Sequence, residues 1–294
     1  MHEFKDAAAL LPMRINSELL LLPESIAGSC EEIRLRTGYP VSLVYGGTEH
    51  YILEEYEICR DDIDAVIEKA SGASLHSIES NISKGFLYVD GGIRIGLCGT
   101  ALVKANGVVG LRDFSSLAIR IPHEIRNCGT EIFKALISDG LSDILIISPP
   151  GAGKTSCIRE YTRIISDKGF RVSLVDERGE IAGLKEGVPQ FDVGSHTDIM
   201  QNLQKRDASI MMLRAMNPQL IAMDEISSPE DVKAIEEIAG CGVKILATAH
   251  AKGVNDLIKR PVYKDLLEKK IFSYAIIIEN KCGERTYRAE KLCA

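Results

Sequence analysis

The chain has 294 residues, of which 45% are hydrophobic and 26% charged, and its formal net charge is -7. This composition is that of a soluble globular protein long enough for two domains, and it excludes an intrinsically disordered chain. The acidic balance disfavours broad nucleic-acid binding, which depends on neutralising phosphates with Lys and Arg, although it leaves room for a local basic patch. We therefore expect no direct nucleic-acid partner.

The sequence shows no targeting or membrane-spanning segment. Its start lacks a basic stretch followed by a long apolar core, so no secretory signal is expected. The longest apolar runs, at 7–11 and 274–278, are far too short to span a bilayer. We expect a cytoplasmic protein that is at most peripheral to a membrane. Its eight cysteines form no C-x-x-C pair, which favours reduced, buried thiols over a zinc site or disulfides.

Residues 1–125 are expected to form an α+β domain built from antiparallel hairpins. Strand patterns occur at 32–36, 41–45, 86–89, 93–103, 108–111 and 116–121. Apolar residues recur at helical spacing over 61–70, which predicts a helix there. Two turn signals separate the later strands: Asp90-Gly91-Gly92 and Ala105-Asn106-Gly107.

Residues 126–294 alternate short apolar strands with helices. The predicted strands are 144–147, 171–175, 220–223, 243–247 and 275–278. The predicted helices are 154–166, 198–215, 230–238 and 254–259. Largely apolar strands between helices indicate a parallel sheet that is covered on both faces. The domain boundary is expected near 122–130.

Residues 148–155 read Ser-Pro-Pro-Gly-Ala-Gly-Lys-Thr, which is typical of a phosphate-binding loop between a strand and a helix. Gly151 and Gly153 let successive backbone N–H groups converge on phosphate oxygens, and a helix N-terminus favours negative charge. Lys154 is expected to reach the β- and γ-phosphates of ATP, and Thr155 to bind Mg²⁺. The residues expected to contact the nucleotide are Pro150, Gly151, Ala152, Gly153, Lys154, Thr155 and Ser156.

The loop differs from the pattern G-x-x-x-x-G-K-[ST] at its first position, where Ser148 replaces glycine. The tripeptide Gly-Lys-[Ser/Thr] at its end is weak evidence by itself. At average amino-acid composition it occurs by chance in about one chain in six of this length. The preceding apolar strand and an acidic pair further along make a chance occurrence much rarer.

The acidic pair is Asp224-Glu225, which ends the apolar strand 220–223. Ligands of open parallel sheets lie at the carboxyl ends of the strands, so both carboxylates are expected beside the phosphate loop. Asp224 fits a metal contact, and Glu225 fits the base that polarises water. The competing interpretation is an exposed acidic turn after a strand, and the phosphate loop upstream favours the catalytic one.

Two other strand ends carry polar residues toward the same edge. Thr248 and His250 follow 243–247, where they would sense the γ-phosphate or position water; a structural histidine is the alternative, and spacing alone does not decide. Asp176 and Glu177 follow 171–175, where they would orient water or metal, or else cap a helix and form salt bridges.

Basic residues precede the acidic strand. They are Lys205, Arg206 and Arg214. We interpret most of them as charges that cover a helix face. Contact of one of them with phosphate or with a neighbouring subunit is the alternative.

Four motifs in a fixed order resemble the stage III sporulation protein AA family. They occupy 148–155, 175–181, 213–219 and 223–226. That family resembles the RecA-like ATPases of type II and type IV secretion and pilus systems, and the resemblance covers nearly the whole chain. It implies an α/β fold: a RecA-like P-loop NTPase core with a mainly parallel sheet, preceded by an α+β N-terminal domain.

The resemblance also implies catalytic positions. The Asp box of secretion ATPases would fall on Asp176 and Glu177, and their His box on 248–250, so Glu177 and His250 join Lys154 and Glu225 as catalytic candidates. Glu225 matches the glutamate of the acidic strand in that family. Asp224 stands where some secretion ATPases have glycine, which makes its metal contact the less secure assignment.

By the same resemblance, arginines of the N-terminal domain reach the γ-phosphate of a bound ATP. The residues in the corresponding region are Arg94, Arg112 and Arg120. Solvated arginines at a strand edge are the alternative for each of them.

The resemblance implies a hexameric ring that binds ATP and Mg²⁺ between subunits. Such a ring would dock on integral membrane proteins from the mother-cell cytoplasm and energise a secretion-like channel during endospore formation. Two other functions stay open. One is a nucleic-acid-stimulated RecA-like ATPase, which the acidic charge and the 5% aromatic content disfavour. The other is a non-hydrolysing nucleotide-dependent scaffold.

Overall fold

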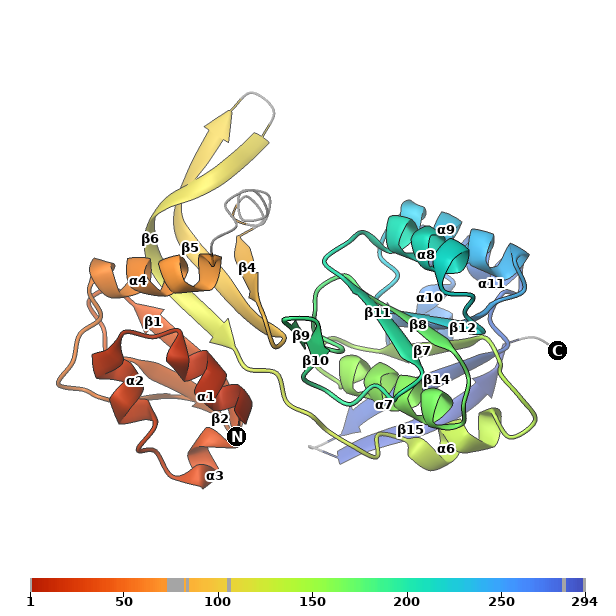
Figure 1. Ribbon diagram of the computed structural model, residues 1–294, viewed down its shortest axis with the longest axis horizontal. Helices are drawn as coiled ribbons and strands as arrows, with labels where there is room; N and C mark the ends of the chain where they lie inside the picture. Colours follow the sequence, from red (N-terminus) through yellow and green to blue (C-terminus); the bar gives the residue numbers. More distant parts are fainter. Residues whose placement is uncertain (1, 73–81, 83–84, 105–106, 282–283, 293–294) are drawn as a thin grey trace. The chain divides into compact units, whose positions relative to one another are not determined.

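The computed structural model of the chain divides into two compact units, Met1–His123 and Glu124–Ala294 (Figure 1). The structure describes residues 2–72, 82, 85–104, 107–281 and 284–292. The boundary expected from the sequence, after residue 125, lies two residues beyond the observed division. Each unit has its own hydrophobic core.

The first unit is an antiparallel sheet with helices on it. Its helices are α1 (His2–Ala9), α2 (Met13–Leu19), α3 (Glu24–Ala27) and α4 (Arg60–Ser71). Its strands are β1 (Cys30–Arg36), β2 (Ser42–Tyr45), β3 (Thr48–Tyr51), β4 (Phe86–Val89), β5 (Ile93–Lys104) and β6 (Gly107–Arg120), in the order β3-β2-β1-β6-β5-β4. Ile33, Ile63 and Ile95 belong to its core, which joins α4 to the sheet.

The β5–β6 hairpin differs from the sequence prediction. The sequence predicts two separate strands at 108–111 and 116–121, but β6 is one continuous strand paired with β5. The pairing register shifts between Cys98 and Thr100, and Asp113 has a φ of 48°. The break in the pattern is therefore a β-bulge rather than a turn.

The predicted turns of this unit have different outcomes. The turn at Asp90-Gly91-Gly92 is confirmed, because it connects the antiparallel pair β4 and β5. The turn at Ala105-Asn106-Gly107 falls partly on residues outside the described ranges. The Asp-Gly-Gly sequence therefore predicts the β4–β5 turn correctly.

The second unit contains a seven-stranded sheet in the order β11-β8-β12-β13-β7-β14-β15. Its strands are β7 (Ile144–Ser148), β8 (Val172–Asp176), β11 (Thr197–Gln201), β12 (Leu220–Met223), β13 (Lys244–His250), β14 (Tyr274–Lys281) and β15 (Glu284–Lys291). All neighbours are parallel except β14 and β15, so the predicted mainly parallel sheet is confirmed. A small hairpin, β9 (Leu184–Lys185) with β10 (Val188–Pro189), stands outside it.

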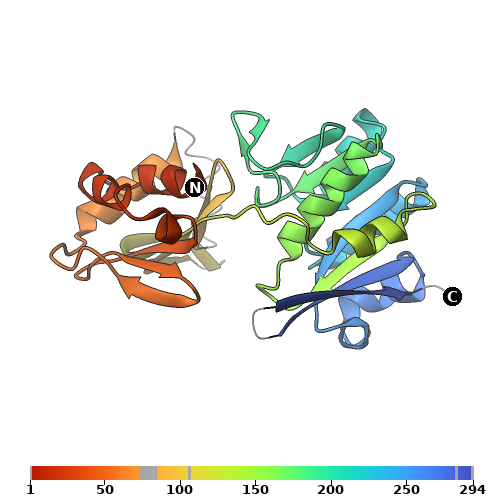
Figure 2. The same ribbon diagram turned by 90° about the horizontal axis from the view of Figure 1, so that it is seen from below.

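Helices cover both faces of this sheet. They are α6 (Thr130–Leu136), α7 (Lys154–Asp167), α8 (Lys205–Ala215), α9 (Pro229–Gly240), α10 (Val254–Leu257) and α11 (Pro261–Glu268). Figure 1 shows α8, α9 and α11 on one side of the strands and α7 on the other, and in Figure 2 the green α7 lies beside α6. Successive strand residues alternate between the faces: Leu145 packs with α9 and α11, and Ile146 packs with α6 and α7.

The helix predicted over 198–215 is wrong in its first part. Residues 197–201 form β11, which pairs in parallel register with β8 from Thr197 opposite Val172 to Gln201 opposite Asp176. The helix α8 starts only at Lys205. Pairing along the sheet edge therefore overrides the helical spacing of this segment.

Within the ranges that the structure describes, no helix has the length and apolar character needed to cross a lipid bilayer.

Candidate nucleotide-binding site

The phosphate-binding loop predicted from the sequence connects β7 to α7. Gly151 has a φ of 74° and Gly153 a φ of 101°, a region that side chains disfavour. Gly153 is also the N-cap of α7, so the unpaired N–H groups of the first helical turn face the loop. The backbone therefore has the form and the partial positive charge that a phosphate group requires.

Ser148, the departure from the glycine pattern, fits the loop without strain. It lies at the end of β7, is fully buried, and is not among the described residues with positive φ. Its hydroxyl donates to the Pro149 carbonyl at 2.9 Å. A glycine is not needed at this position, because the backbone stays in a conformation open to any residue.

Lys154 is buried and folds back on the loop. Its Nζ lies 3.1 Å from the Pro149 carbonyl oxygen, 3.3 Å from both oxygens of Ser148, and 2.7 Å from Nδ1 of His250. Burial lowers the pKa of Lys154 to about 8, against the opposing charges of Glu225 and Asp224. The ammonium thus contacts neutral acceptors that a phosphate can replace.

His250 connects the phosphate loop to the acidic strand. The strand β13 lies between β7 and β12, with His250 opposite Ser148 in the register. Nε2 of His250 lies 3.0 Å from Oε2 of Glu225, and Nη1 of Arg178 lies 3.6 Å from the same oxygen. With the Lys154 ammonium donating to Nδ1, the neutral ring carries its proton on Nε2 and donates to Glu225.

Asp224 faces the same edge of the sheet. It is 6% exposed, and its Oδ1 accepts from the Thr248 hydroxyl at 3.2 Å and from the Glu225 N–H at 2.8 Å. Thr155, the second residue of α7, adds a hydroxyl at the phosphate loop. Carboxylate and hydroxyl oxygens are the ligands that Mg²⁺ prefers, so these residues fit the predicted metal.

Asp176 has a different environment from the other carboxylates. It is fully buried at the end of β8, and its Oδ2 accepts from the N–H groups of Ile181 and Ala182 at 3.1 and 2.9 Å. Its Oδ1 has no hydrogen-bond partner among the described residues. Burial raises the pKa of Asp176, and the charge of Asp224 raises it further. Asp176 holds the turn that follows β8 against the strand end.

Glu177 forms an ion pair with Lys205. Lys205 is only 4% exposed and also lies 3.9 Å from Oδ2 of Asp231, whose side chain completes the capping box of α9 with the N-cap Ser228. Lys205 is therefore the one of the three basic residues that does not cover the outer face of the helix. Arg206, paired with Glu237 at 3.1 Å, and the exposed Arg214 do lie on the outside of α8.

The three candidate arginines, Arg94, Arg112 and Arg120, lie on β5 and β6 of the first unit. The Arg94 guanidinium lies over the rings of Phe86 and Tyr88, at 4.5 and 5.8 Å from their centres. Arg112 lies 3.6 Å from Asp113 of its own strand, and Arg120 lies 3.1 Å from Glu32. The side chains of Arg112 and Arg120 are more than three-fifths exposed, at 64% and 62%.

Sequence reasoning misses residues that the fold brings to this region. Arg178 lies within the second of the four family motifs, but nothing in the sequence around it indicates its proximity to Glu225.

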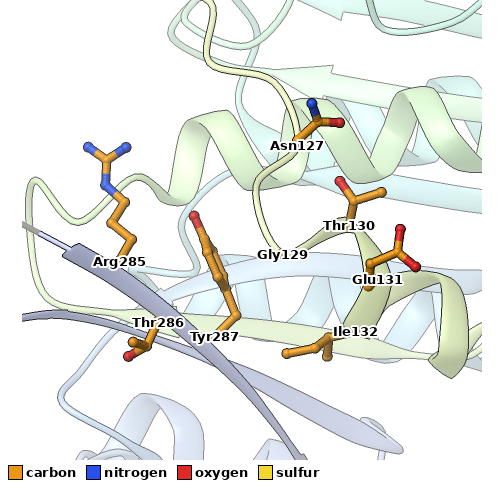
Figure 3. A pocket seen from close by; sticks show the side chains of 8 residues that line it. All are labelled: Asn127, Gly129, Thr130, Glu131, Ile132, Arg285, Thr286 and Tyr287. Carbon is orange, nitrogen blue, oxygen red and sulfur yellow. The ribbon is translucent and has the colours of Figure 1, made fainter.

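A cavity of about 550 Å³ next to the start of α6 is lined by Asn127, Gly129, Thr130, Glu131, Arg285 and Tyr287, among others (Figure 3). Its β15 side is not predicted, because the sequence pattern does not predict β15 itself.

The fold of the whole chain resembles solved secretion and pilus ATPases. The Legionella pneumophila ATPase DotB has a TM-score of 0.60 at 17% identity, covering 95% of this chain and 79% of DotB. The pilus retraction motor PilT, solved with bound ADP, has a TM-score of 0.62 at 16% identity, covering 91% of this chain and 82% of PilT. At this identity the likeness concerns the fold, and it defines the class: the RecA-like fold of secretion ATPases.

The chain belongs to the family described as sporulation stage III, protein AA, whose model matches residues 6–289. It is similar to stage III sporulation protein AA of Bacillus subtilis (strain 168), with 32% identity over 286 residues. That alignment covers 96% of this chain and 92% of the Bacillus protein. The resemblance predicted from the four motifs is therefore confirmed.

Proposed function

We propose that this protein is a P-loop ATPase that hydrolyses ATP to ADP and phosphate and acts as the motor of a secretion-like membrane complex in endospore formation. One observation carries the proposal. Lys154, His250 and Glu225 come from α7, β13 and the end of β12, and they form a connected series of contacts at one edge of the sheet. The family and the fold shared with DotB and PilT support it.

Nucleotide binding uses the loop and the start of α7. The N–H groups of residues 151–156 surround the phosphates, and the Lys154 ammonium exchanges the carbonyls of Ser148 and Pro149 for phosphate oxygens. Thr155 and Asp224 would hold Mg²⁺, which would supply positive charge beside the nucleotide phosphates. The exchange favours the charged form of Lys154, because phosphate provides the counter-charge that the loop carbonyls lack.

Glu225 is the residue that orients and deprotonates the attacking water. His250 positions it through the 3.0 Å contact, and Arg178 adds a positive charge beside the same oxygen. When Lys154 moves to phosphate, His250 loses the donor at Nδ1 while its Nε2 contact with Glu225 remains available. His250 thereby links the state of the phosphate loop to the position of Glu225.

In this proposal Glu177 does not contact the reacting groups and acts through its neighbour Arg178. It contacts Lys205 and is followed directly by Arg178, which contacts Glu225. We assign it the positioning of Arg178 through the turn after β8. This role differs from the direct catalytic role that the resemblance implied.

The active assembly in this proposal is a homo-hexamer with nucleotide between subunits. The exposed guanidiniums of Arg112 and Arg120 are the stronger candidates to reach a neighbour's γ-phosphate, since Arg94 is stacked on two rings. The ring would dock on integral membrane proteins from the cytoplasm of the mother cell. Support for the motor role comes from the family and from the fold shared with PilT, which is a pilus retraction motor.

Mass measurement with and without Mg·ATP, combined with phosphate release, tests the proposal. We expect ATP to favour a six-subunit assembly that hydrolyses ATP, and Lys154→Ala to abolish both effects. A monomer at every concentration without hydrolysis would contradict the motor. Binding of ATP without hydrolysis in the assembled state would favour a scaffold, and stimulation by DNA or RNA instead of membrane partners would favour the nucleic-acid-stimulated ATPase.

A further inference from the structure

Lys205 carries its charge at a place where local physics disfavours a cation. It is the first residue of α8 and only 4% exposed. The N–H groups at a helix N-terminus carry partial positive charge, and lysine is seldom buried without a partner. We propose that Lys205 is a positioning residue for ATP hydrolysis, which fixes the Arg178 guanidinium relative to the Glu225 carboxylate. This inference rests on the proposed function of the site.

The Lys205 ammonium lies between two carboxylates from different segments. It forms an ion pair with Glu177, in the turn that follows β8, and its Nζ lies 3.9 Å from Oδ2 of Asp231, in the first turn of α9. The strands β8 and β12 are parallel neighbours in the sheet, so the segments that follow them lie side by side at its carboxyl edge. One cation therefore joins the segment after β8 to the segment after β12.

Asp231 holds the chain just beyond Glu225. Its Oδ2 accepts from the N–H groups of Ser227 and Ser228 at 2.8 and 3.0 Å, and from the Ser227 hydroxyl at 3.2 Å. Ser227 is only two residues after Glu225. This end of the link therefore fixes the backbone from which the Glu225 side chain extends.

Glu177 holds the other end of the link. The next residue is Arg178, whose Nη1 lies 3.6 Å from Oε2 of Glu225. The backbone of this turn has a support of its own, because the Gly179 N–H donates to the Asp176 carbonyl at 3.2 Å. Loss of the ion pair should therefore reorient Glu177 and Arg178 without unfolding the turn.

Stability alone does not account for a lysine at this position. A buried ion pair is often no more stabilising than well-packed apolar side chains of similar volume. Asp231 also keeps its three donors from Ser227 and Ser228 without the lysine, so the start of α9 does not depend on it. What the ammonium adds is a fixed separation between two segments, one carrying Arg178 and the other Glu225.

The experiment measures ATP hydrolysis and equilibrium binding of Mg·ATP by full-length variants, at a temperature where urea titration shows each to be folded. Lys205→Met should lower kcat by roughly ten- to hundredfold, the range for a misplaced catalytic group. The dissociation constant for Mg·ATP should stay within about threefold of wild type, because the phosphate loop is unchanged. Lys205→Arg retains the charge and should recover part of kcat. Arg206→Met is the matched control and should change neither quantity.

A double-mutant cycle tests whether Lys205 acts through Glu177. Glu177→Gln should lower kcat by a factor similar to that of Lys205→Met, since both remove the same ion pair. The double variant should then lose no more than the larger single loss, because residues in direct contact are not additive. Losses that multiply would contradict the proposed link.

The other outcomes are also decisive. An unchanged kcat in folded Lys205→Met, or equal losses in kcat and in ATP affinity, would overturn the positioning role. If Lys205→Met fails to fold, Glu177→Gln decides by the same criteria, because its side chain is 35% exposed and tolerates replacement. Wild type without hydrolysis would refute the proposed ATPase and this inference with it, whereas an active wild type with unaffected variants would refute the inference alone.

Discussion

Nζ of Lys154 lies 2.7 Å from Nδ1 of His250, a contact between the first residue of α7 and the last residue of β13. Because the other ring nitrogen of His250 reaches Glu225 at 3.0 Å, the residue expected to bind phosphate is connected to the residue expected to activate water. We expect bound nucleotide phosphates to compete for the Lys154 ammonium and so to weaken its contact with His250.

Replacing His250 tests this connection. We expect His250→Ala to lower kcat for ATP hydrolysis by roughly ten- to hundredfold, because Glu225 loses the donor that orients it. The dissociation constant for ATP should change much less. His250→Gln, which retains a donor near the position of Nε2, should recover part of kcat. An unchanged kcat for His250→Ala would show that the histidine has only a structural role.

The pKa of Lys154 predicts how ATP affinity depends on pH. In the free protein this pKa is about 8, and the groups that face the ammonium are His250, Glu225, Asp224 and Cys157. Bound phosphate favours the charged form and raises the pKa, so binding takes up a proton between pH 8 and the higher value. We expect about tenfold weaker ATP binding at pH 9 than at pH 7.

Fluorescence titrations across this pH range, with calorimetry in two buffers of different ionisation enthalpy, measure both the affinity and the proton uptake. Lys154→Arg is the control, because a guanidinium stays charged throughout. If the wild-type affinity did not change between pH 7 and pH 9, the buried ammonium would not be the group that titrates.

The raised pKa of Asp176 predicts a pH dependence of stability opposite to that of most carboxylates, whose pKa is lowered on folding. Its pKa is raised in the folded state, so its contribution to stability is present below the unfolded pKa and is lost as pH rises through the folded one. At pH 7 the Asn variant keeps an acceptor for Ile181 and Ala182 but avoids the buried charge. We expect Asp176→Asn to be as stable as wild type, or more stable by on the order of 1 kcal/mol.

Urea unfolding at pH 7 and pH 4 measures this difference. The advantage of the Asn variant should shrink as pH falls, because a raised pKa makes the folded carboxyl take up a proton before the unfolded one does, which removes the buried charge. Asp176→Leu is the matched control: it removes the acceptor and should cost about 1–3 kcal/mol. A clear loss of stability in Asp176→Asn at pH 7 would mean that the carboxylate is charged and held by a favourable partner.

Lys205 and Arg206 are adjacent residues with different surroundings. Lys205 is 4% exposed and contacts Glu177 and Asp231, whereas Arg206 pairs with Glu237 between side chains that are 46% and 44% exposed. Lys205→Met should lower the free energy of unfolding by about 1–3 kcal/mol. That is less than for a fully buried pair, because Glu177 is 35% exposed.

Arg206→Met should change the free energy of unfolding by less than about 0.5 kcal/mol, since exposed ion pairs contribute little. Chemical denaturation of both variants tests the contrast. Equal effects at the two positions would mean that Lys205 acts as an ordinary surface charge.

Much of the second unit could be predicted because its signals are local. The strand that ends at Ser148 and the strand that ends just before Asp224 are short apolar runs. The glycines of the phosphate loop stand at fixed spacing from Lys154. Parallel strands that are buried on both faces must be apolar throughout, so hydrophobicity alone identifies them. Bringing their carboxyl ends together then predicts the neighbourhood of Lys154, Glu225 and His250.

The missed features depend on tertiary pairing. The edge strand β15 carries Arg285 and Arg288 among polar residues, and only its pairing with β14 makes it a strand. The same holds for β11, whose sequence continues the helical spacing of α8. The contact of Arg178 with Glu225 joins residues far apart in the chain, which no spacing rule reveals.

The most direct test of the proposed ATPase is Glu225→Gln, studied for ATP binding and single-turnover phosphate release in the same preparation. Loss of the carboxylate should leave the dissociation constant for Mg·ATP within about threefold of wild type, because the phosphates are held by the loop and Lys154. Phosphate release should fall by roughly a hundredfold or more, the range for a lost general base. Wild-type rates in a Glu225→Gln protein that binds ATP normally would contradict the assignment of Glu225 and, with it, the mechanism built on its contact with His250.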